Sequence, residues 1–323
     1  MIAALPDALY TRNVQVESAP AALPRRFALT LSPAGFRRVA MAAVAMLVLI
    51  VASGATVRLT GSGLGCPAVT VDVSACVKAY GARGYHADIE FGNRVVSGLT
   101  VLVALVLAAA AARTKGLGRG TKLLAAVTFL ATFAQAPLGA VTVHYHLNPY
   151  LVMSHFWLAL LALGLGVVVL LEATRTVQGG GNALPALARL GGAALLSAVT
   201  VLVVSGALST AAGRFPGSSG ATVVDRLWFF HSAVYWHVRA VALFGAVFLV
   251  LAAWAWRERV GWLLRSCGGL LAILLVQMGI GELQYRTYGT VPWGVVVLHV
   301  VAGAVLFAWT VGLVARLWRP VET

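Results

Sequence analysis

Long runs of apolar residues constrain this chain more than any other feature. Several of them exceed the roughly 18 to 20 apolar residues that a helix needs to cross about 30 Å of hydrocarbon, and they are far longer than a membrane strand. Of the 323 residues, 60% are hydrophobic and 11% are charged, whereas soluble domains carry roughly 25% charged residues. The sequence therefore excludes a water-soluble globule and predicts an all-α polytopic membrane protein.

Charges, glycines and prolines divide the apolar sequence into eight predicted transmembrane helices. These are residues 38–59, 89–112, 121–143, 150–172, 186–209, 226–254, 262–285 and 292–317. The first four give a predicted four-helix bundle over residues 38–172, and the last four a second bundle over residues 186–317. A tail of residues 1–37, a linker of residues 173–185 and a tail of residues 318–323 complete the predicted organisation.

The two bundles share an ordered series of residues. Gln135, Gly139, Pro149 and His155 in the first half are matched by Gln277, Gly281, Pro292 and His299 in the second. The interval from glutamine to glycine is four residues in both halves, and the interval from glutamine to histidine is 20 against 22. Because each half has an even number of spans, both halves begin on the same side of the membrane. We expect two duplicated four-helix bundles packed side by side.

The placement of basic residues predicts the orientation of the chain. The formal net charge is +14, and most of the basic residues fall in the two tails and in alternate short loops, which the positive-inside rule places in the cytoplasm. Residues 1–37 lack a short apolar core followed by a cleavage site, so we expect a retained tail. Both termini are predicted to be cytoplasmic, and the charge flanks helices rather than indicating a nucleic-acid partner.

Two of the three cysteines, Cys66 and Cys76, fall in the longest loop, over residues 60–88. This orientation places the loop in the extracytoplasmic compartment, where two cysteines ten residues apart can form a disulfide. Such a bridge would act as a structural staple or would also exchange electrons. Cys267 stands alone near the inner side.

Ionisable residues inside the predicted spans are few, and most lie toward the outer ends of their helices. Such residues are costly in a membrane and tend to face a bundle interior. They are Glu90, Arg94, His155, His231, His237, Arg239, Glu282 and His299.

Two neutral imidazoles on facing helices suit the axial positions of a haem iron, and His231 and His299 offer such a pair in the second half. His237 competes with His231, but six residues place it about 240° around the helix, so both cannot address one iron. We prefer His231 because its distance from the predicted helix start resembles that of His155 and His299. Polar packing is the alternative role for each. His144 and His146, in an outer loop, are expected to be surface residues or to line a haem edge.

Glu90, Asn93 and Arg94 share one face of the outer turn of the second span. One interpretation is an interfacial ion pair between Glu90 and Arg94. The other is a carboxylate that takes protons beside a substrate cavity, with Arg94 near a propionate. Asn93 is suited to orienting substrate or water, since an amide is a poor iron ligand.

Four segments together resemble the haem A synthase family, whose members convert haem O to haem A for cytochrome oxidase. They are residues 54–67 (GATVRLTGSGLGCP), 90–94 (EFGNR), 135–155 (QAPLGAVTVHYHLNPYLVMSH) and 277–299 (QMGIGELQYRTYGTVPWGVVVLH). The resemblance runs over most of the chain, from about residue 54 to residue 318.

This resemblance implies a membrane oxidoreductase that oxidises the C8 methyl group of haem O to a formyl group by successive hydroxylations with water-derived oxygen. It implies haem b held by His231 and His299, substrate haem O held by His155, a catalytic carboxylate at Glu90, and a disulfide between Cys66 and Cys76. Members of the family have a histidine where this chain has Asn93, so the first half lacks the usual second imidazole.

The resemblance also sets the expected context of the protein, a multi-pass protein of a bacterial cell membrane. Expected partners are haem O, haem A, lipid, haem O synthase, cytochrome oxidase assembly proteins and a second copy of the chain, with no nucleic acid. Two other functions are open: a non-catalytic haem carrier or assembly factor, which Asn93 favours, and a membrane cytochrome that exchanges electrons with quinone.

Overall fold

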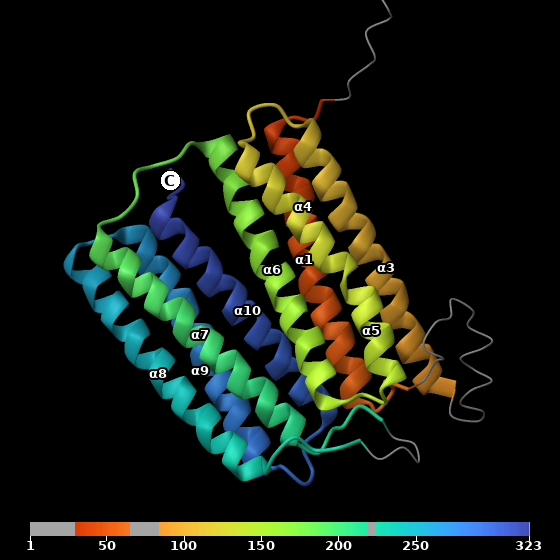
Figure 1. Ribbon diagram of the computed structural model, residues 1–323. Coiled ribbons are helices and arrows are strands. Elements are labelled where there is room, and N and C mark those ends of the chain that lie inside the picture. Colours follow the sequence, from red (N-terminus) through yellow and green to blue (C-terminus); the bar gives the residue numbers. More distant parts are fainter. Residues whose placement is uncertain (1–29, 65–83, 219–223, 323) are drawn as a thin grey trace, which may run out of the picture.

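The computed structural model describes residues 30–64, 84–218 and 224–322. Over these ranges the chain forms nine helices and no β-strand, and the helices make eight crossings long and apolar enough to span a membrane (Figure 1). The all-α polytopic prediction is therefore confirmed. The helices are α1 (Pro33–Leu59), α3 (Gly84–Arg113), α4 (Arg119–Phe133), α5 (Gln135–His144), α6 (Pro149–Gln178), α7 (Ala186–Ala212), α8 (Phe230–Arg257), α9 (Gly261–Arg286) and α10 (Trp293–Trp318).

Local sequence explains where some helices begin and end. The Ser32 hydroxyl accepts a hydrogen bond from the Gly35 amide at 3.1 Å, and a proline follows at the first helical position of α1. Asn148 caps α6 in the same way, and its side chain accepts from the Tyr150 amide at 3.0 Å. Serine or asparagine followed by proline is a common helix start. Helix α6 runs to Gln178, six residues beyond the predicted end, and stops where Gly179 takes a φ of 95°.

The third crossing is broken into α4 and α5 at Ala134. Pro137 explains the break, because proline donates no amide hydrogen bond and its ring clashes with the carbonyl four residues earlier, here that of Phe133. The related crossing α9 is continuous, and Gly279 stands at the position that corresponds to Pro137. The sequence predicted one span here and did not predict its break.

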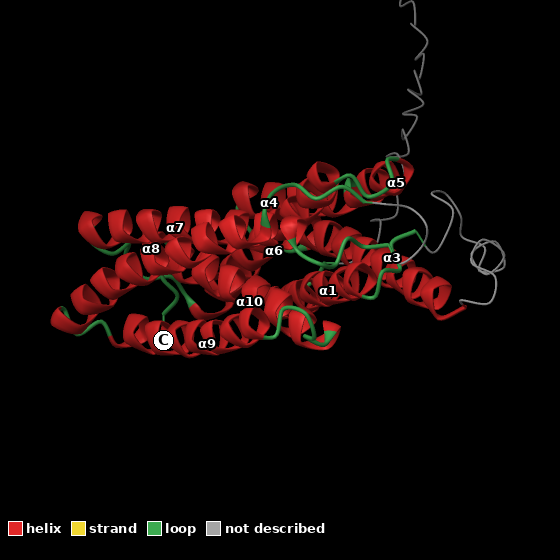
Figure 2. Cartoon of the chain, turned by 90° about the horizontal axis from the view of Figure 1, so that it is seen from below, coloured by secondary structure: helices red, strands yellow, loops and turns green. Residues whose placement is uncertain are grey.

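The crossings form two bundles in contact. Helices α1, α3, α4, α5 and α6 pack as the first bundle, and α7, α8, α9 and α10 as the second. Helix α10 packs against both α1 and α6, so it forms most of the contact between the bundles (Figures 1 and 2). The first described residues and the C-terminus lie at the same end of the molecule, which we call the inner end (Figure 1).

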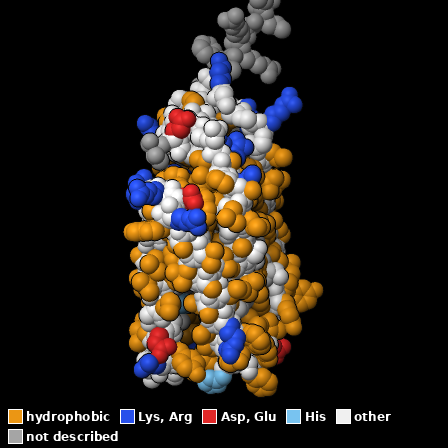
Figure 3. Space-filling view, turned by 90° about the vertical axis from the view of Figure 1, so that its left-hand side faces the viewer, with side chains coloured by type: hydrophobic (Ala, Val, Ile, Leu, Met, Phe, Trp, Pro, Cys, Tyr) orange, Lys and Arg blue, Asp and Glu red, His pale blue; other side chains and the backbone are white. Residues whose placement is uncertain are grey.

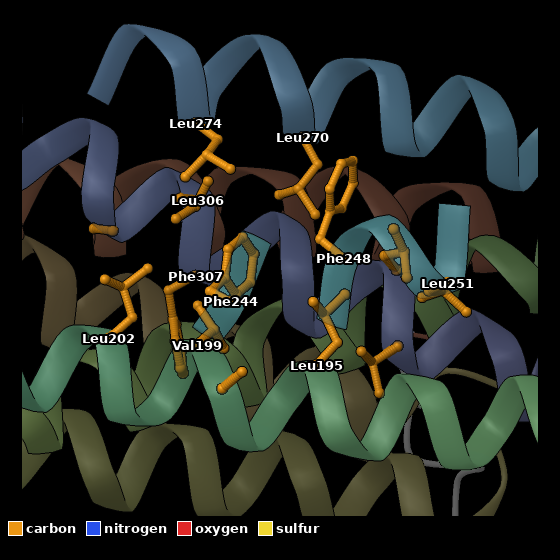
Figure 4. Packing of buried hydrophobic residues seen from close by; sticks show 14 of the residues in the cluster. Leu195, Val199, Leu202, Phe244, Phe248, Leu251, Leu270, Leu274, Leu306 and Phe307 are labelled. Atoms are coloured by element: carbon orange, nitrogen blue, oxygen red, sulfur yellow. The ribbon is translucent and has the colours of Figure 1, made fainter. Parts of the chain in front are cut away.

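One hydrophobic core joins the bundles, and a second cluster, around Phe36 and Leu107, lies within the first bundle. The joining core contains large side chains from the second bundle, including Phe244, Leu270 and Phe307 (Figure 4). Leu47 of α1 and Leu160 of α6 belong to the same core. Toward the opposite end of the molecule, which we call the outer end, the buried side chains become small. Outward from Leu202, the buried hydrophobic residues of α7 and α8 are Ala207, Ala211, Ala212, Ala233 and Ala240.

Polar contacts tie the bundles together at both ends. On the face that Figure 3 shows, hydrophobic side chains cover most of the surface between the two ends. At the outer end the Arg58 Nη2 donates to the Thr210 carbonyl at 3.0 Å, and the Gly63 amide donates to the Gly217 carbonyl at 2.8 Å. At the inner end the buried Glu172 carboxylate lies 2.7 Å from Arg319 Nε. These contacts fix how the bundles sit against each other.

Candidate functional site

Three histidines lie at matching depths in the helices that carry them. His155 and His299 are each the seventh residue of their helices, α6 and α10, and His237 is the eighth residue of α8. His231 is only the second residue of α8, because that helix begins at Phe230 and not at the predicted residue 226. Counted from the start of its observed helix, His237 therefore matches His155 and His299, and His231 does not.

The packing around His299 agrees with this selection. The imidazoles of His237 and His299 lie close enough to interact electrostatically. Each ring also lies against a glycine of a neighbouring helix. A Cβ atom added at Gly206 would be 3.1 Å from His237 Cε1, and one added at Gly281 would be 3.4 Å from His299 Cε1. The first distance is shorter than the usual carbon contact of about 3.5 to 4.0 Å, and the second is at the edge of ordinary contact, so Gly206 in particular gives its ring the room it occupies.

His231 has a different environment. Its side chain is exposed at the outer end of α8 and makes edge contacts with Phe230 and with Tyr285, whose ring centroid lies 6.2 Å away. The structure therefore brings His237, rather than His231, toward His299. This placement argues against the preference for His231, which depended on a helix start four residues too early.

The first bundle repeats one half of this arrangement. A Cβ atom at Gly139 of α5 would lie 3.4 Å from His155 Cε1 of α6, the same distance as between Gly281 and His299. On the other side of the bundle, the position that corresponds to His237 holds Asn93, whose side-chain oxygen accepts a hydrogen bond from the Ser53 hydroxyl at 2.9 Å. The first bundle thus offers one imidazole and one amide.

The sequence contains a signal for these equivalences that the predictions above did not use. The interval from Asn93 to His155 is 62 residues, and so is the interval from His237 to His299. A Ser-Gly-Ala series precedes both pairs, at residues 53–55 and residues 205–207. The serine of each series contacts the residue at the Asn93 or His237 position. The duplication therefore covers all four helix positions around each site.

Glu90 is buried, with 4% of its surface exposed. Its Oε1 accepts a hydrogen bond from Arg94 Nη2 at 2.8 Å. His86, which the sequence analysis did not single out, lies one turn earlier on the same face of α3, is also buried, and has its Nδ1 2.9 Å from the Ser62 hydroxyl. The spacing of 86, 90 and 94 is the helical signal that reveals it. In contrast, the Glu282 side chain pairs with an arginine at 2.6 Å but is 58% exposed.

Other predicted residues lie away from these sites. His144, the last residue of α5, and His146, in the loop that follows, are both exposed, as expected for surface histidines. Arg239 is exposed, and its guanidinium carbon stacks over the Tyr235 ring. Cys66 and Cys76 lie outside the described residues, so their predicted disulfide stays a prediction.

The donor set of the second bundle fits a haem iron. His237 and His299 supply two imidazoles in an apolar setting, and the His299 Nδ1 is buried without a hydrogen-bond partner. Small buried alanines line the outer parts of α7 and α8. In the first bundle the His155 Nδ1 is likewise buried without a partner. Within the described ranges no three ligating side chains gather as a zinc site requires.

Comparisons with known proteins agree with this arrangement. Residues 84–311 match the family described as cytochrome oxidase assembly protein. The chain is similar to a "Heme A synthase" of Staphylococcus haemolyticus, with 33% identity over 36% of this chain and 38% of that protein. It is also similar to a "Heme A synthase" of Lysinibacillus sphaericus, with 32% identity over 38% of this chain and 40% of that protein. The matches thus span less than half of either relative. Because the family match covers most of the chain, this protein belongs to the cytochrome oxidase assembly protein family.

Proposed function

We propose that this protein is a haem A synthase, a membrane oxidoreductase that oxidises the C8 methyl group of haem O to a formyl group with oxygen from water. One observation carries the proposal: both bundles hold an imidazole at the same depth, but among the described residues a buried carboxylate lies near that depth in the first bundle and not in the second. Glu90 lies three residues before Asn93, whereas Val234 lies three residues before His237. The family match and the two relatives named "Heme A synthase" support the same activity.

The second bundle is the site of the resident haem b in this proposal. His237 and His299 would hold its iron, in place of the pair His231 and His299. The matching depths, the electrostatic influence of His237 on His299 and the glycines beside the two rings support this choice. When bound there, a haem would accept and pass on electrons.

The first bundle is the substrate site. His155 holds the iron of haem O from one side, and Asn93 faces it from the other. Because an amide is a poor iron ligand, the face of the haem O iron toward Asn93 has no protein ligand. Water can approach the iron from that face, and the substrate can move there. Ser53 keeps the amide in place through its 2.9 Å hydrogen bond. The substrate is therefore held through one protein ligand and the resident haem through two, which suits a molecule that must leave after reaction.

Glu90 is the catalytic residue of the proposal. Oxidation of a methyl group to a formyl group releases protons as well as electrons, and a carboxylate beside the porphyrin edge can accept them. The 2.8 Å hydrogen bond from Arg94 holds Glu90 Oε1 in one position. The Arg94 side chain is also partly exposed, and in this proposal its positive charge attracts a propionate of the substrate.

The proposed setting is the cell membrane of a bacterium, with both termini in the cytoplasm. Basic residues near the inner end support this orientation. Haem O synthase would supply the substrate, cytochrome oxidase and its assembly proteins would take the product, and a homo-oligomer is a further part of the proposal.

The test is the haem content of bacterial cells that make haem O and express this chain. Haems are extracted and separated by chromatography. We expect haem A with the wild-type chain, none with Glu90→Ala, and the wild-type yield with Glu282→Ala. The last variant is a matched control, because it removes a carboxylate that also pairs with an arginine one turn away but is exposed. Absence of haem A with the wild-type chain, or a full yield with Glu90→Ala, contradicts the proposal.

A further inference from the structure

The Ser205 hydroxyl lies within hydrogen-bonding distance of both the Leu202 carbonyl and the His237 imidazole. It donates to the Leu202 carbonyl at 2.8 Å, and its oxygen lies 3.0 Å from His237 Nδ1. A hydroxyl has a single proton to donate. With that proton placed on the Leu202 carbonyl, the hydroxyl acts toward His237 as an acceptor, and the Leu202 carbonyl is a second acceptor for the same ring. Nδ1 of His237 therefore carries the ring proton, and the lone pair of the neutral imidazole is on Nε2.

This support is specific to one of the three deep histidines. The Nδ1 atoms of His155 and His299 are buried without a hydrogen-bond partner. In the first bundle the matching hydroxyl, that of Ser53, donates to the Asn93 side chain instead. Among the described residues, His237 is thus the deep imidazole whose Nδ1 is held by a side chain.

We propose that Ser205 is a positioning residue that fixes the tautomer and ring plane of His237, so that Nε2 is presented to the haem iron. The inference rests on the proposed haem site of the second bundle and adds to it a residue that does not contact the metal. Outer hydrogen bonds of this kind orient metal-ligating histidines and make them more basic, and their loss costs roughly 10-fold to 100-fold in affinity.

The experiment compares two variants of nearly equal shape, Ser205→Thr and Ser205→Val, in the purified full-length protein. Threonine keeps the hydroxyl and valine does not. Ser209→Ala is the matched control, because the Ser209 hydroxyl lies one turn further along α7 and donates only to the Ser205 carbonyl, at 3.0 Å. Haem b is titrated into each protein, and the electron paramagnetic resonance spectrum and midpoint potential of the bound haem are measured.

We expect Ser205→Val to bind haem b roughly 10-fold to 100-fold more weakly than wild type, with altered low-spin g values and a higher midpoint potential, because a less basic ligand stabilises ferric iron less. Ser205→Thr and Ser209→Ala should resemble wild type in all three measurements. Wild-type affinity, spectrum and potential in Ser205→Val would overturn the inference. Absence of low-spin haem from the wild-type protein would instead overturn the proposed haem site itself.

Discussion

Replacing Gly206 by alanine tests the geometry around His237 directly. The added Cβ would lie 3.1 Å from His237 Cε1, whereas carbon atoms in contact are about 3.5 to 4.0 Å apart. The imidazole must therefore move by a few tenths of an ångström. A ligand needs to be held within about 0.5 Å of its productive position, so this shift takes up much of that tolerance and we expect the variant to lose part of its haem.

The expected size of this loss follows from the cost of overpacking, about 1 to 3 kcal/mol. Applied to the haem-bound state, that cost corresponds to about 5-fold to 150-fold weaker binding. The same change at Gly281 or Gly139 should have a smaller effect, because the corresponding distances are 3.4 Å.

The assay is titration of haem b into the purified variants, followed by absorption spectroscopy. Gly245→Ala is the control, because nothing lies within 4 Å of a Cβ at that position of α8, and alanine favours a helix over glycine by about 1 kcal/mol. Equal affinity in Gly206→Ala and Gly245→Ala, or a larger loss at Gly281 than at Gly206, would refute the reasoning.

Two further predictions concern other parts of the molecule. Asn93→His places an imidazole beside the Ser53 hydroxyl, as in the second bundle, so we expect a second low-spin haem in the absorption spectrum; an unchanged spectrum at saturating haem would contradict the equivalence of the two sites. Glu172→Gln removes the charge that pairs with Arg319 at 2.7 Å at the inner end, and because Glu172 is buried we expect a loss of about 1 to 3 kcal/mol, seen as a lower melting temperature in detergent; an unchanged melting temperature would show that this contact does not stabilise the protein.

Much of the fold follows from the sequence because each helix that crosses a membrane must be apolar over its whole length. Apolar length alone predicted eight crossings, and the structure confirms them. The break at Ala134 was missed, although Pro137 was a local signal for it, since hydropathy averages over a whole span and does not register one missing amide. The choice between His231 and His237 depended on where α8 begins, and apolarity alone set that start four residues too early.

The details of the site depend on contacts that no sequence pattern specifies by itself. The ion pair between Glu90 and Arg94 could be anticipated from their spacing, but not whether the pair would be buried in the bundle or would face the lipid. The Ser-Gly-Ala series was visible in both halves, but its meaning required the contacts of Ser53 with Asn93 and of Ser205 with His237.

The most direct test of this account is the absorption spectrum of the purified protein with His231 or His237 replaced by alanine. The account predicts that His231→Ala keeps a low-spin haem b and that His237→Ala loses it, as His299→Ala does. A low-spin haem that survives in His237→Ala and disappears in His231→Ala would contradict the central claim that His237 and His299 hold one iron between them.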